Sequence, residues 1–102
     1  MDRKVIWLRA SLDDLEQIGN YIGGNSADYG STVVKKIYDA AMDLARFPQM
    51  GRVVPEWEDA AYRERIVYRY RLIYRLKGAD RIEILSVIHG ARLLPEDLRE
   101  RK

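Results

Sequence analysis

Residues 62–92 read YRERIVYRYRLIYRLKGADRIEILSVIHGAR, and this stretch decides the fold. In its middle, apolar and aromatic residues alternate with basic ones, and a period of two is typical of a β-strand with two unlike faces. One side holds Tyr70, Leu72, Tyr74 and Leu76, and the other holds Arg69, Arg71, Ile73, Arg75 and Lys77. The stretch therefore predicts a sheet with one apolar face and one cationic face.

Charge is distributed unevenly along the chain. Residues 62–92 contain seven Arg, one Lys and three acidic residues, a formal charge of +5, whereas the whole chain carries +2. Residues 11–61 contain nine acids and only four bases. This asymmetry indicates a molecule with two different faces, and the basic face suits an anionic partner.

The bulk composition limits the class of protein. A length of 102 residues fits a single domain, with a core over residues 1–95 and a C-terminal tail over residues 96–102. The chain has no cysteine, which excludes disulfides and thiolate chemistry and fits a reducing cytoplasm. It has no apolar run of about 18 residues that would span a membrane. Its start does not resemble a signal peptide. We expect a cytoplasmic protein without a membrane segment, metal or cofactor.

The first half of the chain predicts a short strand followed by two helices. The strand lies within residues 4–10, and Ser11 then stands as the N-cap of a first helix, with Asp14 in a capping-box position. The pair Gly23-Gly24 ends this helix because glycine accepts the left-handed conformation at C′. Apolar residues at three- and four-residue steps give this helix one buried stripe.

A second amphipathic helix is capped by Asn25 or Ser26 and runs to about Phe47, where Pro48 ends it. The connection between the helices is about three residues long, so we expect them to lie antiparallel. Residues 49–61 are then expected to form an acidic loop. Trp57 in this loop has no evident structural need, and an exposed tryptophan can mark a contact surface.

Three strands are predicted next, at Tyr62–Val67, Tyr70–Lys77 and Arg81–His89. Short connections require antiparallel pairing. A short helix after Pro95, frayed at its end, closes the chain. The fold class is therefore α+β, in the order β-α-α-β-β-β with a short C-terminal helix. An antiparallel helical hairpin packs on one face of a mostly antiparallel twisted sheet, and the arginine face is left to solvent or a partner.

Several segments together resemble the RelE/ParE superfamily, the toxins of bacterial type II toxin–antitoxin systems of the plasmid-stabilisation type. The segments are VIWL at 5–8, DDLEQIGNYI at 13–22, LARFPQMGRVVPE at 44–56, YRE at 62–64, YRLIYR at 70–75 and ILSVIHGAR at 84–92. The resemblance covers nearly the whole chain and is closer to the ParE-like branch. It implies a cytoplasmic toxin that is held silent by a partner antitoxin.

The resemblance leaves two activities open. A ParE-like toxin poisons DNA gyrase by binding, whereas a RelE-like toxin is a ribosome-dependent mRNA endonuclease. Arg71 and Arg92 match the two RelE-type arginines, whose guanidinium groups suit phosphate. Arg63 and Arg65 match positions where RelE-type enzymes carry lysines, and arginine cannot act as a general base. If the chain cuts RNA, the expected catalytic residues are Arg71, Arg92 and His89.

We favour the ParE-like activity because RNA cleavage needs a base and an acid as well as cations. After Arg92 the chain has no Tyr or His, so proton transfer rests on His89 alone. The residues expected to bind the target or antitoxin are Arg63, Arg65, Arg69, Arg71, Arg75, Arg92 and Trp57. Two simpler interpretations also stand: the arginines are a solvated sheet face, or the chain is a non-toxic binding module.

Overall fold

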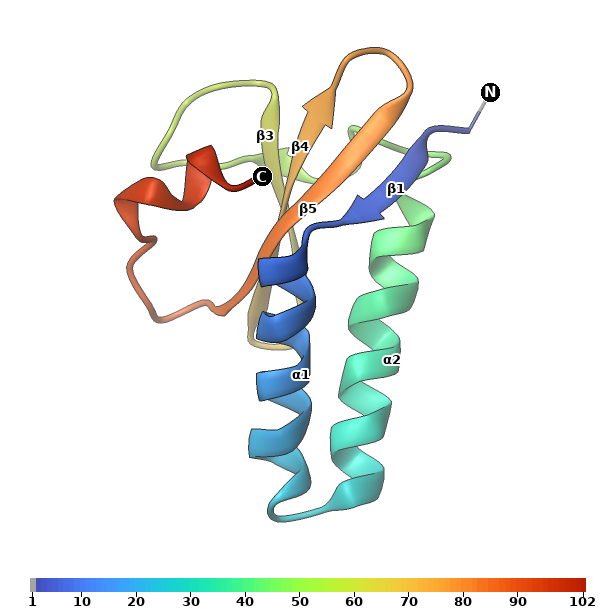
Figure 1. Ribbon diagram of the computed structural model, residues 1–102, viewed down its shortest axis with the longest axis vertical. Helices are drawn as coiled ribbons and strands as arrows, with labels where there is room; N and C mark the ends of the chain where they lie inside the picture. The colour runs from blue at the N-terminus through green and yellow to red at the C-terminus, as the bar shows by residue number, and fades with distance from the viewer. Residues whose placement is uncertain (1) are drawn as a thin grey trace.

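The computed structural model describes residues 2–102 and has the predicted α+β architecture, with a helical hairpin against one sheet (Figure 1). The elements are β1 (Lys4–Trp7), α1 (Arg9–Gly23), α2 (Ala27–Asp43), β2 (Arg52–Val53), β3 (Tyr62–Val67), β4 (Tyr70–Lys77), β5 (Arg81–His89) and the 3-10 helix η1 (Glu96–Glu100). Among residues 2–102, no helix has the length and apolar character needed to cross a membrane.

The five strands form one sheet in the order β1-β5-β4-β3-β2. All neighbouring pairs are antiparallel except β1 and β5, which run parallel with Lys4 opposite Arg81. A parallel pair needs a long crossover connection. The helical hairpin begins that connection, and β2, β3 and β4 complete it before the chain returns as β5. The boundaries predicted for β3, β4 and β5 are confirmed residue for residue.

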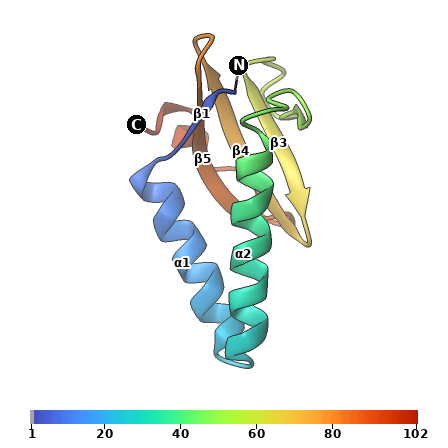
Figure 2. The same ribbon diagram turned by 90° about the vertical axis from the view of Figure 1, so that its right-hand side faces the viewer.

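The two helices lie side by side and antiparallel against one face of the sheet (Figure 2). The apolar stripes of the helices meet the face of β4 that carries Leu72 and Tyr74, both fully buried. The helices approach closely at Gly30, where a Cβ atom would lie 2.8 Å from the carbonyl oxygen of Gly19. A side chain at this position would push the helices apart, so glycine sets their separation.

The helix ends differ in part from the prediction. Helix α1 begins at Arg9 after Leu8, and Ser11 lies inside the first turn, where its hydroxyl donates to the Leu8 carbonyl at 2.6 Å. The Leu8 amide donates to Ile84, so pairing with β5 fixes the helix start and no side-chain cap forms. Gly24 has φ −59° and is right-handed, so the predicted left-handed C′ glycine is wrong.

Helix α2 has the predicted cap at Ser26, whose side chain accepts from the amide of Tyr29. It ends at Asp43, earlier than Phe47, because the chain tightens into 3-10-type turns such as the one from Leu44 to Ala41. The short strand β2 that follows was not predicted. The two-residue turn between β3 and β4 places Tyr68 at φ +55°, a left-handed conformation that matches the twist of a tight hairpin.

The second face of the sheet is covered, which corrects the expectation that it is open. The loop before β3 and the C-terminal segment lie together on this side, away from the helical hairpin (Figure 1). They form a second core of Leu8, Val54, Ile73, Leu85 and Leu98. Leu98 is only 1% exposed, so the tail is docked and the predicted fraying is wrong. Arg101 holds the C-terminal segment against the sheet by donating to Asp14 at 2.9 Å and to the Leu85 carbonyl at 2.8 Å.

Candidate functional site

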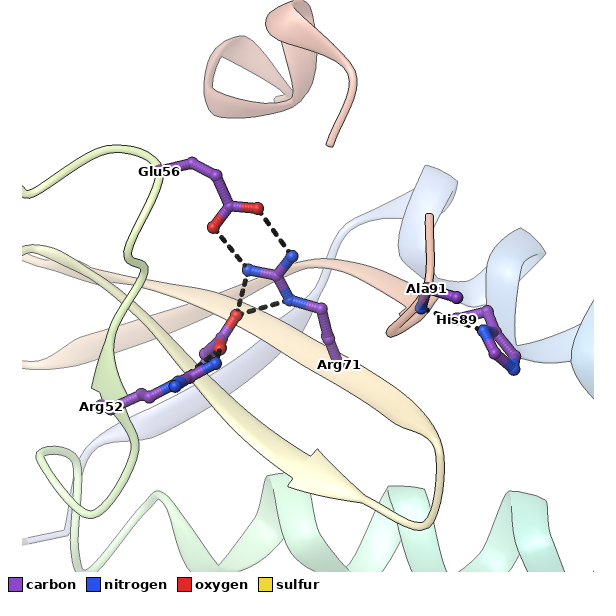
Figure 3. Close-up of polar contacts among 6 residues, drawn as sticks. Arg52, Glu56, Arg71, His89 and Ala91 are labelled. Atoms are coloured by element: carbon purple, nitrogen blue, oxygen red, sulfur yellow. Dashed lines mark hydrogen bonds and ion pairs between the residues drawn. The ribbon is translucent and has the colours of Figure 1, made fainter. Parts of the chain in front are cut away.

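Arg71 lies on the second face of the sheet, between two carboxylates (Figure 3). Its Nε donates to Glu64 on β3 at 2.7 Å, and its two terminal nitrogens each donate to Glu56 in the loop at 2.8 Å. Glu64 also accepts from Arg52 Nε at 2.6 Å. The Arg71 side chain is 9% exposed and that of Glu64 is 0% exposed. These residues, Arg52, Glu56, Glu64 and Arg71, are called the carboxylate clamp below.

Two members of the clamp, Arg71 and Glu56, favour their charged forms. The hydrogen bonds that Arg71 donates to Glu56 raise the pKa of Arg71, and those that it donates to Glu64 raise it further, against the opposing effect of burial. The same bond to Arg71 lowers the pKa of Glu56. A bidentate guanidinium–carboxylate pair is strong and directional. Arg71 is therefore committed to its own protein, and the expectation of a free guanidinium at this position is not met.

Two more of the predicted binding arginines lie on the helix side of the sheet. Arg65 donates to the Ala40 carbonyl at 2.9 Å and to Asp43 at 3.1 Å, which attaches β3 to helix α2. Arg63 donates to the carbonyls of Gly51 and Ala60. The prediction grouped both with the cationic face. The pairing of β3 with β4 instead aligns Arg65 with Leu72, which faces the helices.

Arg75 and Trp57 are also engaged within the protein. Arg75 binds Glu83 through Nε at 3.0 Å and donates to the Arg99 carbonyl in the tail at 3.3 Å. Trp57 packs edge-on against Tyr62 with ring centroids 5.3 Å apart, and the guanidinium of Arg99 lies 5.5 Å from the Trp57 ring. Trp57 thus has a structural role, which the sequence did not indicate.

The remaining predicted residues, Arg69, His89 and Arg92, are exposed to solvent and lie where the β3–β4 turn meets the end of β5. The Gly90 amide donates to the Arg69 carbonyl at 2.8 Å, which joins the two segments. His89 pairs with Tyr70 across the strands, and its Nδ1 accepts from the Ala91 amide at 3.1 Å (Figure 3). The exposed residues here are Tyr68, Arg69, His89, Arg92 and Leu93, called the turn end below.

The turn end and the clamp are separate. Figure 3 shows the guanidinium of Arg71 directed toward Glu56, while His89 lies on the other side of the Arg71 backbone. In residues 2–102, no side-chain hydrogen bond or ion pair engages Arg69 or Arg92. Arg69, Arg92 and His89 thus lie at one end of the sheet, and the guanidinium of Arg71 is directed away from them, toward Glu56.

Sequence reasoning missed the acidic partners. The period of two in β3 places Glu64 on the same face as Arg71, and this signal was present in the sequence. Glu56 carried no such signal because it lies in a loop. Asp14 was assigned to a helix cap, but it accepts from the Ser86 hydroxyl at 2.7 Å and from the tail.

Among solved structures, a chain of the chromosomal ParDE TA system from P. aeruginosa is similar, with a TM-score of 0.71 and 21% identity. The match covers 85% of this chain and 95% of that one, and it shows a shared fold.

The sequence matches the family of the ParE toxin of type II toxin-antitoxin system, parDE, over residues 5–94, and the chain belongs to that family. The predicted membership of the RelE/ParE superfamily, on the ParE side, is confirmed, and it implies an antitoxin partner. No curated protein sequence matches the chain.

Proposed function

We propose that this ParE-type toxin arrests growth by binding and poisoning a macromolecular target, with DNA gyrase as the first candidate. The observation that carries the proposal is the carboxylate clamp. Arg71, one of the two arginines that match RelE-type positions, has its donors occupied by Glu56 and Glu64. A guanidinium in this state has little capacity left to stabilise a phosphorane.

Cleavage of RNA would also require a base and an acid beside the reacting phosphate. Arg63 and Arg65 bind backbone carbonyls on the helix side of the sheet. His89 is exposed and already accepts a hydrogen bond through Nδ1, which leaves one ring nitrogen for chemistry. These contacts favour a binding toxin over the alternative, a ribosome-dependent mRNA endonuclease.

The turn end is the surface we assign to the target. Arg69 and Arg92 supply two unpaired cations, and Leu93, at 92% exposed, supplies an uncovered apolar side chain beside them. Tyr68 adds a half-exposed ring at the tip of the β3–β4 turn. Arginine and tyrosine are enriched among the hot-spot residues of protein–protein interfaces, and Leu93 adds apolar area that a partner can bury.

We assign the antitoxin to the groove between the helices. A hollow of about 780 Å³ opens there, lined at one end by Leu12 and at the other by Gly24 and Ala27, with Gly19 and Ser31 between. Leu12 is 44% exposed, so the groove offers apolar surface to an amphipathic helix of a partner. We do not assign acidic residues of the antitoxin to Arg71 and Arg75, because Glu56, Glu64 and Glu83 already neutralise these arginines.

The target is tested with purified toxin in gyrase supercoiling and cleavage-complex assays. Wild-type protein should inhibit, and the Arg69→Glu/Arg92→Glu variant should lose inhibition because its cationic contacts are reversed. Lys36→Glu/Arg46→Glu, which reverses two charges at exposed positions elsewhere, is the matched control and should inhibit normally. Absence of inhibition by wild-type protein, together with ribosome-dependent mRNA cleavage in primer extension, would favour the endonuclease instead.

The groove is tested by measuring antitoxin affinity for Ser31→Trp. Ser31 is exposed and lines the groove, so an indole there should block a helix without disturbing the core. Lys36→Trp places the same side chain on α2 away from the lining residues and should bind as wild type. Equal affinities of the two variants would move the antitoxin to another surface.

A further inference from the structure

Three cations form a row at the far end of the sheet from the turn end. Lys4 on β1 is aligned with Arg81 on β5, and Arg81 is aligned with Lys77 on β4. Aligned residues on adjacent strands project from the same face. The next residues along, Val5, Ile82 and Leu76, pack into the core under the helices, so the three cations project from the opposite face.

This row is unfavourable for the isolated fold. Adjacent strands lie about 4.8 Å apart, and like charges placed directly opposite each other are destabilising. Arg71 and Arg75, the next basic residues along β4 on this face, have acidic partners in Glu56, Glu64 and Glu83. Within residues 2–102, no ion pair involves Lys4, Lys77 or Arg81. In the part of the chain that the structure describes, no ion pair offsets the repulsion among the three cations, and a bound anion would reduce it.

A shallow hollow adjoins the row. It has a volume of about 670 Å³ and is lined by Arg75, Lys77, Arg81, Glu83, Glu100 and Lys102. Glu83 is engaged by Arg75, so Lys77, Arg81 and Lys102 outnumber Glu100 among the lining residues without a side-chain partner. The hollow therefore offers a net positive rim to whatever enters it.

The lining chemistry selects the kind of anion. All the lining side chains are charged, so the hollow offers no apolar pocket for an anchor residue of a peptide. It also has no aromatic ring on which a base could stack. A straight row of cations without anchors or stacking platforms suits the sugar-phosphate backbone, which presents closely spaced charges along a line.

We propose that Lys4, Lys77 and Arg81 form a contact site for the phosphodiester backbone of nucleic acid, without sequence preference. The site lies at the β4–β5 turn, at the opposite end of β4 and β5 from Arg69 and His89 (Figure 1). A toxin bound to a protein through its turn end can therefore hold nucleic acid with its other end. The inference does not depend on which target the turn end binds.

The site predicts a defined salt dependence. On duplex DNA, neutralising three phosphates gives a slope of about −2.7 in a plot of log affinity against log salt. Affinity should then fall about 40-fold between 50 and 200 mM salt. The variant Lys77→Gln/Arg81→Gln keeps one cation of the row, so its slope should be smaller by about 2 and its loss only about 3-fold over the same range.

The test is fluorescence anisotropy of labelled 20-nucleotide DNA, in duplex and single-stranded arms, titrated with the full chain. Lys36→Gln/Arg46→Gln removes one Lys and one Arg at exposed positions elsewhere and is the matched control. The proposal stands if the row variant loses slope and the control does not, and the arm with the tighter binding identifies the preferred form. Equal losses of slope in the row variant and the control would show that only net charge matters and would overturn the proposal. Displacement by polyglutamate at equal charge concentration would also overturn it, in favour of an acidic protein partner.

Discussion

Replacing Arg71 by methionine should lower the Tm of the protein substantially, because it leaves the buried carboxylate of Glu64 without its main partner. Glu64 is 0% exposed at its side chain, and only Arg52, which is 64% exposed, would still bind it. Removing one member of a buried ion pair costs about 3–5 kcal/mol. Arg52 retains part of the compensation, so we expect a loss of about 3 kcal/mol. For a domain of this size that corresponds to a decrease in Tm of about 12–24 °C.

The matched double variant separates an unpaired charge from a missing contact. In Glu64→Leu/Arg71→Met the buried carboxylate is gone, and apolar replacement of a whole buried pair is often neutral or stabilising. Glu56 is 42% exposed and Arg52 more so, which allows water to solvate both. The double variant should therefore recover about 2 kcal/mol or more relative to Arg71→Met alone.

Urea titrations followed by circular dichroism, combined with thermal unfolding, measure both differences. The reasoning fails if Arg71→Met lies within about 1 kcal/mol of wild type, or if the double variant is no more stable than the single one. The same double variant reports on function, because it removes the Arg71 guanidinium from a stable protein. It should still inhibit the target, and loss of inhibition with intact stability would show that Arg71 makes a functional contact.

Three further predictions concern stability. Leu98→Ala should cost about 2–5 kcal/mol, measured by urea unfolding, because Leu98 is 1% exposed in the second core; a loss under 1 kcal/mol would mean that the tail is not docked. Arg71 lowers the pKa of Glu56 from its ordinary 4.5, so the stability that Glu56 contributes is complete above that value and is lost as pH falls through the lowered pKa. The difference in urea midpoint between wild type and Glu56→Gln should accordingly vanish in acid, and a pH-independent difference would argue against the pair. Gly30→Ala should lower the Tm in thermal unfolding, since its Cβ would lie 2.8 Å from the Gly19 carbonyl oxygen. Gly23→Ala meets nothing within 4 Å and should leave the Tm unchanged or raise it. Equal changes in Tm for the two variants would contradict the packing argument.

The strands were predictable because their signal is local. Tyr70–Lys77 alternates apolar and basic residues over its whole length, and the boundaries of β3, β4 and β5 followed from that alternation and from the turn at Gly78. Strand β2 has two residues, too few for any period to be visible. Its existence depends on pairing with β3.

The functional surfaces were harder to predict because their state depends on distant partners. A basic strand face looks alike in sequence whether its arginines meet solvent or carboxylates. Arg71 meets Glu56, which reaches it from a loop. The tail was read as polar and frayed, yet Leu98 and Arg101 tie it to the sheet and to Asp14 on α1. Arg69, His89 and Arg92 are exposed because they lie at a turn and near a strand end.

The parallel pairing of β1 with β5 also determines when the fold can form during synthesis. Lys4 pairs with Arg81, so β1 cannot join the sheet until β5 has been synthesised, long after β1 and the helical hairpin. Contacts this far apart in sequence also slow folding. A product terminated before β5 would lack both the partner of β1 and His89. Premature termination of translation should therefore release an inert fragment, and toxicity should begin only with chains that have extended past β5.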